Sequence, residues 1–227
     1  MKFLYELMYR YFENKRYTYL KNNLGYLQKT VNLGGHHLTY FKSDNQGKPL
    51  ILIHGLLDAS FGFRKLAPLV KKDCQIFLFD IPGFGRSPMP KIRYLYQLDI
   101  FAELIYQAIQ KLDLQNVTLA GHSMGGLISQ HVALLDKESS SPIIQKLILI
   151  SSGGIPHHKR DEMKEILFPA SKKELERLLG YLYFAKFPQP NFLIKSTLVH
   201  SWKSIEHKYL AENTIKREKE IFFGKKA

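Results

Sequence analysis

Short apolar runs alternate with amphipathic stretches through the middle of the chain. Four short, mainly apolar runs are predicted to form strands: Leu50–Ile53, Ile76–Phe79, Val117–Ala120 and Ile144–Ile150. The first is continuously apolar, which is typical of a parallel strand covered on both faces. Helices are predicted between them, where apolar residues recur three and four positions apart: about Phe61–Val70, Gln97–Leu112 and the stretch from Ser123 through Leu135. Asp58 or Ser60 is expected to cap the first of these helices. The repeated strand–helix order predicts an α/β fold, a mostly parallel sheet with helices on both faces.

Residues 1–26 are predicted to form a basic, Tyr-rich amphipathic helix. Its apolar positions recur at helical spacing: Phe3, Leu4, Leu7, Met8, Tyr11 and Phe12. Such a helix fits three settings, which are peripheral contact with a membrane, packing on its own domain, or packing on a partner subunit. Two short strands are predicted to follow, at Leu27–Val31 and Leu38–Phe41.

The pattern changes after Pro156, where strand-like runs vanish. Four helical stretches are predicted there: Glu162–Phe168, Lys172–Tyr183, Phe192–Ser204 and Ile205–Phe223. The chain is therefore expected to comprise an N-terminal helical extension (1–26), an α/β core (27–156) and a helical block (157–227).

The formal net charge of the 227 residues is +13, and the excess lies at the two ends. Net charge is +5 over residues 1–48, +2 over 49–154 and +6 over 155–227. Solvated helix faces account for this distribution, although an anionic membrane surface or nucleic acid are alternative partners. Because the sequence contains no zinc-finger spacing, aromatic RNA-binding motif or basic helix-turn-helix, we expect no nucleic-acid partner.

The cysteine content and the lengths of the apolar runs indicate where in the cell the protein is expected. Cys74 is the only cysteine, so no intrachain disulfide can form. Glu6 and Arg10 interrupt the N-terminal apolar run, which argues against a secretory signal, and no apolar run approaches the length of a membrane span. The expected location is the cytoplasm or the periphery of a membrane.

The motif with the most chemical content is Gly121-His122-Ser123-Met124-Gly125, a G-x-S-x-G pattern between a predicted strand and a predicted helix. A strand that turns into a helix within one residue forces Ser123 into a strained conformation. Side chains two positions to either side would collide, which is why both positions are Gly. The turn exposes the Ser123 hydroxyl and puts the Met124 N–H at a helix N-terminus, where it can bind a developing oxyanion.

Two further stretches accompany this elbow. His54-Gly55 follows the first apolar strand, and Asp80-Ile81-Pro82-Gly83-Phe84-Gly85-Arg86-Ser87 follows the second. In this order and spacing the three stretches resemble the α/β-hydrolase fold family, specifically its lipase- and esterase-like members, over residues of about 25 to 223. The resemblance implies that Ser123 is a nucleophile and that the N–H groups of Leu56 and Met124 form an oxyanion hole.

The same resemblance implies supporting roles for His54, Gly55 and His122. His54 is expected to hold the oxyanion loop, and His122 to point away from the nucleophile rather than act as its base. Asp80 is interpreted as a loop-fixing residue rather than a catalytic acid. The helical block 157–227 resembles the cap that family members insert after the strand corresponding to Ile144–Ile150.

The sequence departs from the family in its catalytic relay. On this fold the acid and the histidine follow the nucleophile in the chain. After the helical block we find no apolar strand, no Gly-x-x-Asp turn and no Gly-His loop. His157 and His158 are alternative bases, although both are expected to be exposed. We therefore expect the catalytic machinery to be incomplete in residues 1–227, as in a fragment, a gene-model truncation or a pseudoenzyme.

These observations predict a serine hydrolase that acts on carboxylic esters through an acyl-enzyme on Ser123, with no metal or organic cofactor. The apolar and aromatic residues of the helical block suggest an apolar acyl or aromatic ester as substrate: Phe184, Phe187, Phe192, Leu193 and Trp202. The alternative is a non-catalytic protein of the same fold that binds a small ligand or a partner. Dehalogenase or epoxide-hydrolase chemistry is disfavoured, because those relatives carry Asp where this chain has Ser123.

Overall fold

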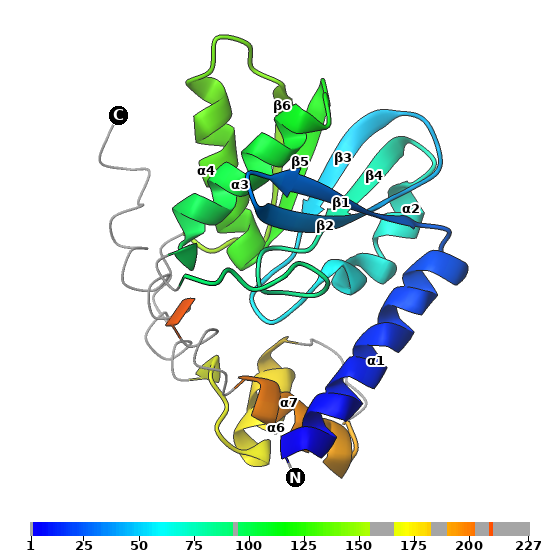
Figure 1. Ribbon diagram of the computed structural model, residues 1–227, viewed down its shortest axis with the longest axis vertical. Helices are drawn as coiled ribbons and strands as arrows, with labels where there is room; N and C mark the ends of the chain where they lie inside the picture. Colours follow the sequence, from blue (N-terminus) through cyan, green and yellow to red (C-terminus); the bar gives the residue numbers. More distant parts are fainter. Residues whose placement is uncertain (1, 93–94, 155–165, 183–189, 203–208, 211–227) are drawn as a thin grey trace. The chain divides into compact units, whose positions relative to one another are not determined.

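The computed structural model describes residues 2–92, 95–154, 166–182, 190–202 and 209–210 (Figure 1). Its elements follow the chain in this order, with η1 a 3₁₀ helix: α1 (Lys2–Asn22), β1 (Leu27–Leu33), β2 (His36–Lys42), β3 (Lys48–Ile53), η1 (Ser60–Arg64), α2 (Ala67–Val70), β4 (Cys74–Phe79), α3 (Leu98–Lys111), β5 (Val117–His122), α4 (Met124–Lys137), β6 (Ile144–Ile150), α6 (Lys172–Leu182) and α7 (Phe192–Trp202). Contacts divide the chain into a helical unit, Met1–Asn14 with Ile155–Glu220, and a sheet-bearing unit, Lys15–Gly154 with Ile221–Ala227.

The sheet-bearing unit contains six strands in the order β1-β2-β4-β3-β5-β6. The last four strands of that order are mutually parallel, whereas β1 and β2 form an antiparallel hairpin whose second strand pairs antiparallel with β4. The predicted α/β class with a mostly parallel sheet is therefore confirmed. Because Ile53 pairs with Gly121 and His122 with Ile150, the carboxyl ends of β3, β5 and β6 lie side by side, and the residues that follow these strands emerge together.

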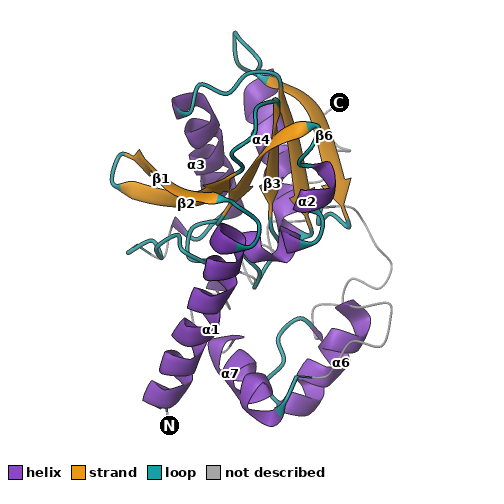
Figure 2. Cartoon of the chain, turned by 90° about the vertical axis from the view of Figure 1, so that its right-hand side faces the viewer, coloured by secondary structure: helices purple, strands orange, loops and turns teal. Residues whose placement is uncertain are grey.

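Helices cover both faces of this sheet. Alternate strand residues pack with α1, η1 and α2 in one apolar cluster: Leu50, Leu52, Ile76 and Leu78. The residues between them are also buried: Ile51, Ile53, Phe77 and Phe79. Figure 2 shows α3 and α4 on the side of the sheet opposite α2. Burial on both faces explains why these strands are continuously apolar in sequence.

The single helix predicted at Phe61–Val70 is wrong in detail, because this stretch forms two short pieces, η1 and α2. Pro68 lacks the N–H that would bond back to Arg64, so one continuous α-helix cannot form. The predicted cap is also wrong: Ala59 and Leu66 are the N-cap residues of the two pieces, and neither forms a cap hydrogen bond through its own side chain. The Ser60 hydroxyl instead donates to the carbonyl of Leu78, at 3.1 Å.

The second half of α1 packs on the sheet-bearing unit. Tyr17 and Leu20 are buried in its apolar cluster, and Tyr17 stacks on Phe41 with 5.2 Å between ring centroids. Of the settings expected for the N-terminal helix, packing on its own domain accounts for this half. The helix ends at Asn22 rather than residue 26, since Gly25 has a φ of 69°. Membrane contact through residues 1–26 stays a prediction.

In the helical unit, α6 and α7 pack through Leu175, Leu179 and Val199. Lys172 lies over Phe192 and Lys195 pairs with Glu176, so the two helices run in the same direction. Phe192 and Leu193, expected to help bind an apolar substrate, are exposed. Several predictions concern residues that the structure does not describe: His157, His158, Phe184, Phe187, the side chain of Trp202, most of the 162–168 helix and most of the 205–223 helix. None of the described helices has the length and apolar character needed to cross a membrane.

Strand β6 forms one edge of the sheet, and its middle is apolar and exposed. Leu147, Ile148 and Leu149 are 39%, 45% and 39% exposed, and no described strand pairs with the outer side of β6. An apolar edge strand with unpaired N–H and C=O groups is a template for another chain. We therefore expect residues 1–227 to self-associate, with size-exclusion chromatography and light scattering giving a mass above the 26.4 kDa of one chain.

A lysine on this edge should oppose that pairing, so Ile148→Lys is expected to shift the protein toward the monomer. The matched control is Leu27→Lys on β1 at the opposite edge, where Leu27 is 52% exposed. This control should leave the mass distribution unchanged. A sharp monomer peak for the wild-type chain, or an equal effect of both substitutions, would contradict association through β6.

Candidate functional site

Ser123 joins β5 to α4 in a backbone conformation that side chains rarely adopt, with φ 52° and ψ −118°. Its N–H donates to the carbonyl of Ile150 at 3.0 Å. Its carbonyl accepts from the N–H groups of Gly126 at 3.0 Å and Gly153 at 2.9 Å. The end of β6, the loop after it and the first turn of α4 therefore hold the strained residue in place.

The two glycines of the motif leave no room for a side chain. A Cβ at Gly121 would lie 2.2 Å from the carbonyl oxygen of Gly125. A Cβ at Gly125 would lie 2.2 Å from the carbonyl oxygen of Ile53 and 2.3 Å from that of His54. Contacts this short with backbone atoms cannot be relieved by moving a side chain. The start of α4 thus lies directly against the end of β3, which is the steric condition the motif predicts.

The loop after β3 lies against Ser123. A Cβ at Gly55 would come within 3.1 Å of Ser123 Cβ. Leu57 has a φ of 59°, and the Gly55 carbonyl accepts from the Asp58 N–H at 3.3 Å, so the loop turns sharply past Leu56. Met124 is the first residue of α4, and its N–H therefore has no partner within the helix.

His54 is fully buried and hydrogen-bonded through both ring nitrogens. Nε2 lies 3.0 Å from the Ile81 N–H and accepts from it, so Nδ1 carries the proton and donates to the Gly55 carbonyl at 2.8 Å. Burial lowers the pKa of His54, which keeps the ring neutral in this arrangement. The imidazole therefore links the loop after β3 to the loop after β4.

Asp80 holds the loop after β4 near the carboxyl ends of the strands. Its buried carboxylate accepts from the Ser60 N–H at 2.7 Å and from the Arg86 N–H at 2.9 Å, and its carbonyl accepts from Ser87 Oγ at 2.6 Å. Ser87 Oγ in turn accepts from the Thr39 N–H on β2 at 2.9 Å. Asp80 thus joins η1 to the loop of residues 81–87.

His122 lies beside the loop after β3, since its Nδ1 is 3.2 Å from the Cβ position of Gly55. Among the described residues, no histidine or carboxylate hydrogen-bonds to Ser123 Oγ. The described part of the chain therefore brings together Ser123, Gly55, Leu56, Met124, His54 and His122. It places no base at the nucleophile.

One positioning residue was not foreseen from the sequence. The Gln130 amide donates to Ser152 Oγ at 2.9 Å and to the Gly153 carbonyl at 3.1 Å. This side chain fixes the loop after β6, whose Gly153 N–H bonds to Ser123. Nothing in the sequence distinguishes Gln130 from any polar residue on a helix, so no local signal was there to find it.

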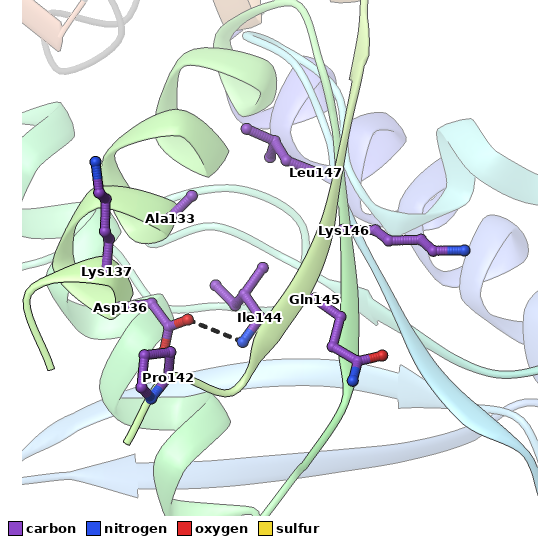
Figure 3. Close-up of a pocket in the computed structure, with 8 residues that line it drawn as sticks. All are labelled: Ala133, Asp136, Lys137, Pro142, Ile144, Gln145, Lys146 and Leu147. Atoms are coloured by element: carbon purple, nitrogen blue, oxygen red, sulfur yellow. Dashed lines mark hydrogen bonds between the residues drawn. The ribbon is translucent and has the colours of Figure 1, made fainter. Parts of the chain in front are cut away.

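A shallow pocket of about 280 Å³ lies at the far end of α4 from Ser123, between the end of that helix and the start of β6 (Figure 3). Asp136 lines it, but its carboxylate already accepts from the N–H groups of Ile143 and Ile144. The pocket therefore belongs to the junction that starts β6. Within the described residues no three His, Cys, Asp or Glu side chains gather in a way that could hold a metal.

Comparison with known proteins agrees with this fold. A family model described as the alpha/beta hydrolase fold matches residues 48–219, more than half of the chain. The chain belongs to the alpha/beta hydrolase fold family.

Individual relatives match parts of the chain. The uncharacterized hydrolase YugF of Bacillus subtilis is 33% identical over 121 residues, which are 53% of this chain and 42% of YugF. The 2-hydroxy-6-oxo-6-(2'-aminophenyl)hexa-2,4-dienoic acid hydrolase of Metapseudomonas resinovorans is 26% identical over 65% of this chain and 50% of its own length. The chain thus spans about half the length of these relatives.

Among solved structures, a membrane phospholipase A described as a bacterial virulence factor superposes with a TM-score of 0.76 and 19% identity. The superposition covers 93% of this chain and 68% of the phospholipase. At that identity the likeness concerns the fold alone.

The buried neutral histidine has a consequence for stability. Below its ordinary pKa of about 6.5, unfolded His54 takes up a proton while folded His54, with its lowered pKa, does not. The free energy of unfolding should therefore fall as the pH drops below about 6.5, by at most about 1.4 kcal/mol per pH unit for this group.

Denaturant titrations from pH 7.5 down to pH 5 would measure this slope. His54→Gln should lower stability throughout and flatten the slope, leaving the part due to His131, whose pKa burial also lowers. Equal slopes for the wild type and the variant would show that His54 takes up its proton alike in both states.

Proposed function

We propose that this protein is a serine hydrolase of carboxylic esters with Ser123 as its nucleophile. The observation that carries the proposal is the strained backbone of Ser123, φ 52°, at the junction of β5 and α4. Such strain costs about 1–3 kcal/mol and persists where function requires it. Here the strained backbone places the Ser123 hydroxyl at the end of the strands where the loop after β3 begins.

In the proposed reaction, Ser123 Oγ attacks the ester carbonyl carbon and passes its proton to a base. The N–H groups of Leu56 and Met124 donate to the oxyanion of the tetrahedral intermediate. The C–O bond then breaks, and the leaving alkoxide takes the proton and departs as an alcohol, with the acyl group on Ser123. Water releases the acid by the same steps.

His54 acts as a positioning residue in this scheme. Its Nδ1–H bond to the Gly55 carbonyl fixes the peptide before Leu56, and Asp80 fixes η1 behind that loop. Gly55 allows the loop to approach Ser123, and His122 packs beside it without serving as the base. The base is assigned to residues outside the described part of the chain.

Two observations support this proposal. The elbow and the neighbouring N–H groups suit acyl transfer, and relatives of this chain are named hydrolases. The proposed substrate is a small ester with an apolar acyl or aromatic group, since the apolar residues Leu56 and Leu57 directly follow Gly55, whose Cβ position lies 3.1 Å from Ser123 Cβ. We propose no cofactor.

The protein expressed from its complete gene should hydrolyse p-nitrophenyl esters, with kcat/KM rising from acetate to longer acyl chains. Ser123→Ala measures the background rate. Tight binding of these esters by a folded protein without turnover would instead favour a non-catalytic ligand-binding role.

A further inference from the structure

A surface of the sheet-bearing unit combines cations with exposed leucines. It is formed by the second half of α1 and by the segment 60–72, and we call it the α1–α2 patch. Its members are Arg16, Tyr19, Phe61, Arg64, Lys65, Leu66, Leu69 and Lys72.

Contacts between the two segments make the patch one surface. The Phe61 ring meets the Tyr19 ring edge-on at 6.0 Å, and the guanidinium groups of Arg16 and Arg64 lie 5.7 and 4.6 Å from its centroid. Lys71 Nζ donates to the Leu24 carbonyl at 3.4 Å.

Buried residues anchor both segments from behind. Tyr17 and Leu20 of α1 and Phe63 and Ala67 of the 60–72 segment share one apolar cluster. The patch is therefore part of the folded unit and does not have to form on binding.

The patch carries a net positive charge. Residues 15–22 and 60–72 contain seven cations and no Asp or Glu: Lys15, Arg16, Lys21, Arg64, Lys65, Lys71 and Lys72. Three carboxylates border it: Asp44 pairs with Lys71 at 2.9 Å, Asp58 lies against Gly62, and Asp73 follows Lys72. The cations outnumber these carboxylates, and Lys65 and Lys72 are exposed, so the surface presents a net positive field to solvent.

Apolar side chains stand among these cations. Leu69 is 76% exposed, the highest value for any large hydrophobic residue in the described ranges, and Leu66 is 38% exposed. Tyr19, at 41%, adds an amphipathic ring of the kind found at membrane interfaces. Leu66 and Leu69 are three residues apart and exposed, whereas Phe63 and Ala67 of the same segment are buried.

We infer that the α1–α2 patch docks on the surface of an anionic lipid bilayer. The lysines and arginines bind lipid phosphates, while Leu66 and Leu69 enter the boundary between headgroups and acyl chains. A nucleic acid would satisfy the cations but offers no apolar layer for Leu69. A bilayer of anionic lipid satisfies both features, and the inference does not depend on chemistry at Ser123.

Flotation with vesicles tests this directly, because bound protein rises with the lipid and aggregated protein sinks. The full chain is mixed with vesicles of phosphatidylcholine plus phosphatidylglycerol, or of phosphatidylcholine alone. The wild type should float with the anionic vesicles only. Lys65→Gln with Lys72→Gln should lower the partition coefficient about thirtyfold, and Leu69→Ser about tenfold.

Matched controls lie elsewhere on the same unit. Lys137→Gln with Lys146→Gln removes two exposed cations near β6, and Leu27→Ser removes an exposed leucine of β1. Both should change partitioning less than about twofold, and Ser123→Ala should not change it. The inference is overturned if the wild type does not float, if the controls lose binding equally, or if Leu69→Ser binds like the wild type.

Discussion

Replacing Ser123 should abolish ester hydrolysis, and the choice of replacement should decide what happens to stability. Without its nucleophile, the complete protein should lose on the order of 10⁵–10⁶-fold in kcat, because only the oxyanion hole and substrate binding remain. Ser123→Gly should also raise the free energy of unfolding by about 1 kcal/mol. Glycine adopts a φ of 52° without strain, and this outweighs the extra entropy of the unfolded chain.

Ser123→Ala is the control for this prediction. Alanine removes the hydroxyl but keeps the Cβ, so it should abolish turnover while changing stability by less than about 0.5 kcal/mol. Circular dichroism during urea titration measures both variants. If Ser123→Gly is less stable than Ser123→Ala, the elbow does not store strain, and the argument from strain to function fails.

Gly125→Ala should prevent the sheet-bearing unit from folding. The new Cβ would meet the carbonyl oxygens of Ile53 and His54 at 2.2 and 2.3 Å, so α4 would have to move off the end of β3. Displacing a helix from the middle of the core should cost more than about 4 kcal/mol, a large share of the stability of a domain.

The matched control is Gly153→Ala in the same unit. There the nearest atoms to the new Cβ are Ser123 O at 3.5 Å and Leu127 Cβ at 3.6 Å, which are ordinary van der Waals contacts. This variant should melt within a few degrees of the wild type, whereas Gly125→Ala should give insoluble protein or no cooperative transition. Similar melting of both variants would contradict the close contact between β3 and α4.

The strained elbow could be predicted because its cause is local. The sequence shows glycine at positions 121 and 125, where a side chain would collide with backbone atoms. The strand Ile144–Ile150 was likewise predicted to the residue, since a mainly apolar run between Pro142 and Gly153 leaves few alternatives. Both features are determined by residues within a few positions of one another in the sequence.

Features that depend on distant contacts were harder to predict. The stretch Phe61–Val70 has helical spacing, yet Pro68 divides it and Asp80, twenty residues after Ser60, takes the Ser60 N–H. The apolar face of α1 is the same whether it meets a membrane or a core, so only tertiary structure shows that Tyr17 and Leu20 are buried. Gln130 holds the loop after β6 through Gly153, which is 23 residues further along the chain, so its role depends on the tertiary fold.

The central claim is that Ser123 is a reactive nucleophile, and covalent labelling tests it most directly. A fluorophosphonate probe should add once to the folded protein expressed from its complete gene, and peptide mass spectrometry should place the adduct on Ser123. Ser123→Ala should take up no probe. Labelling that survives this substitution, or a folded wild-type protein that remains unlabelled, would contradict the account.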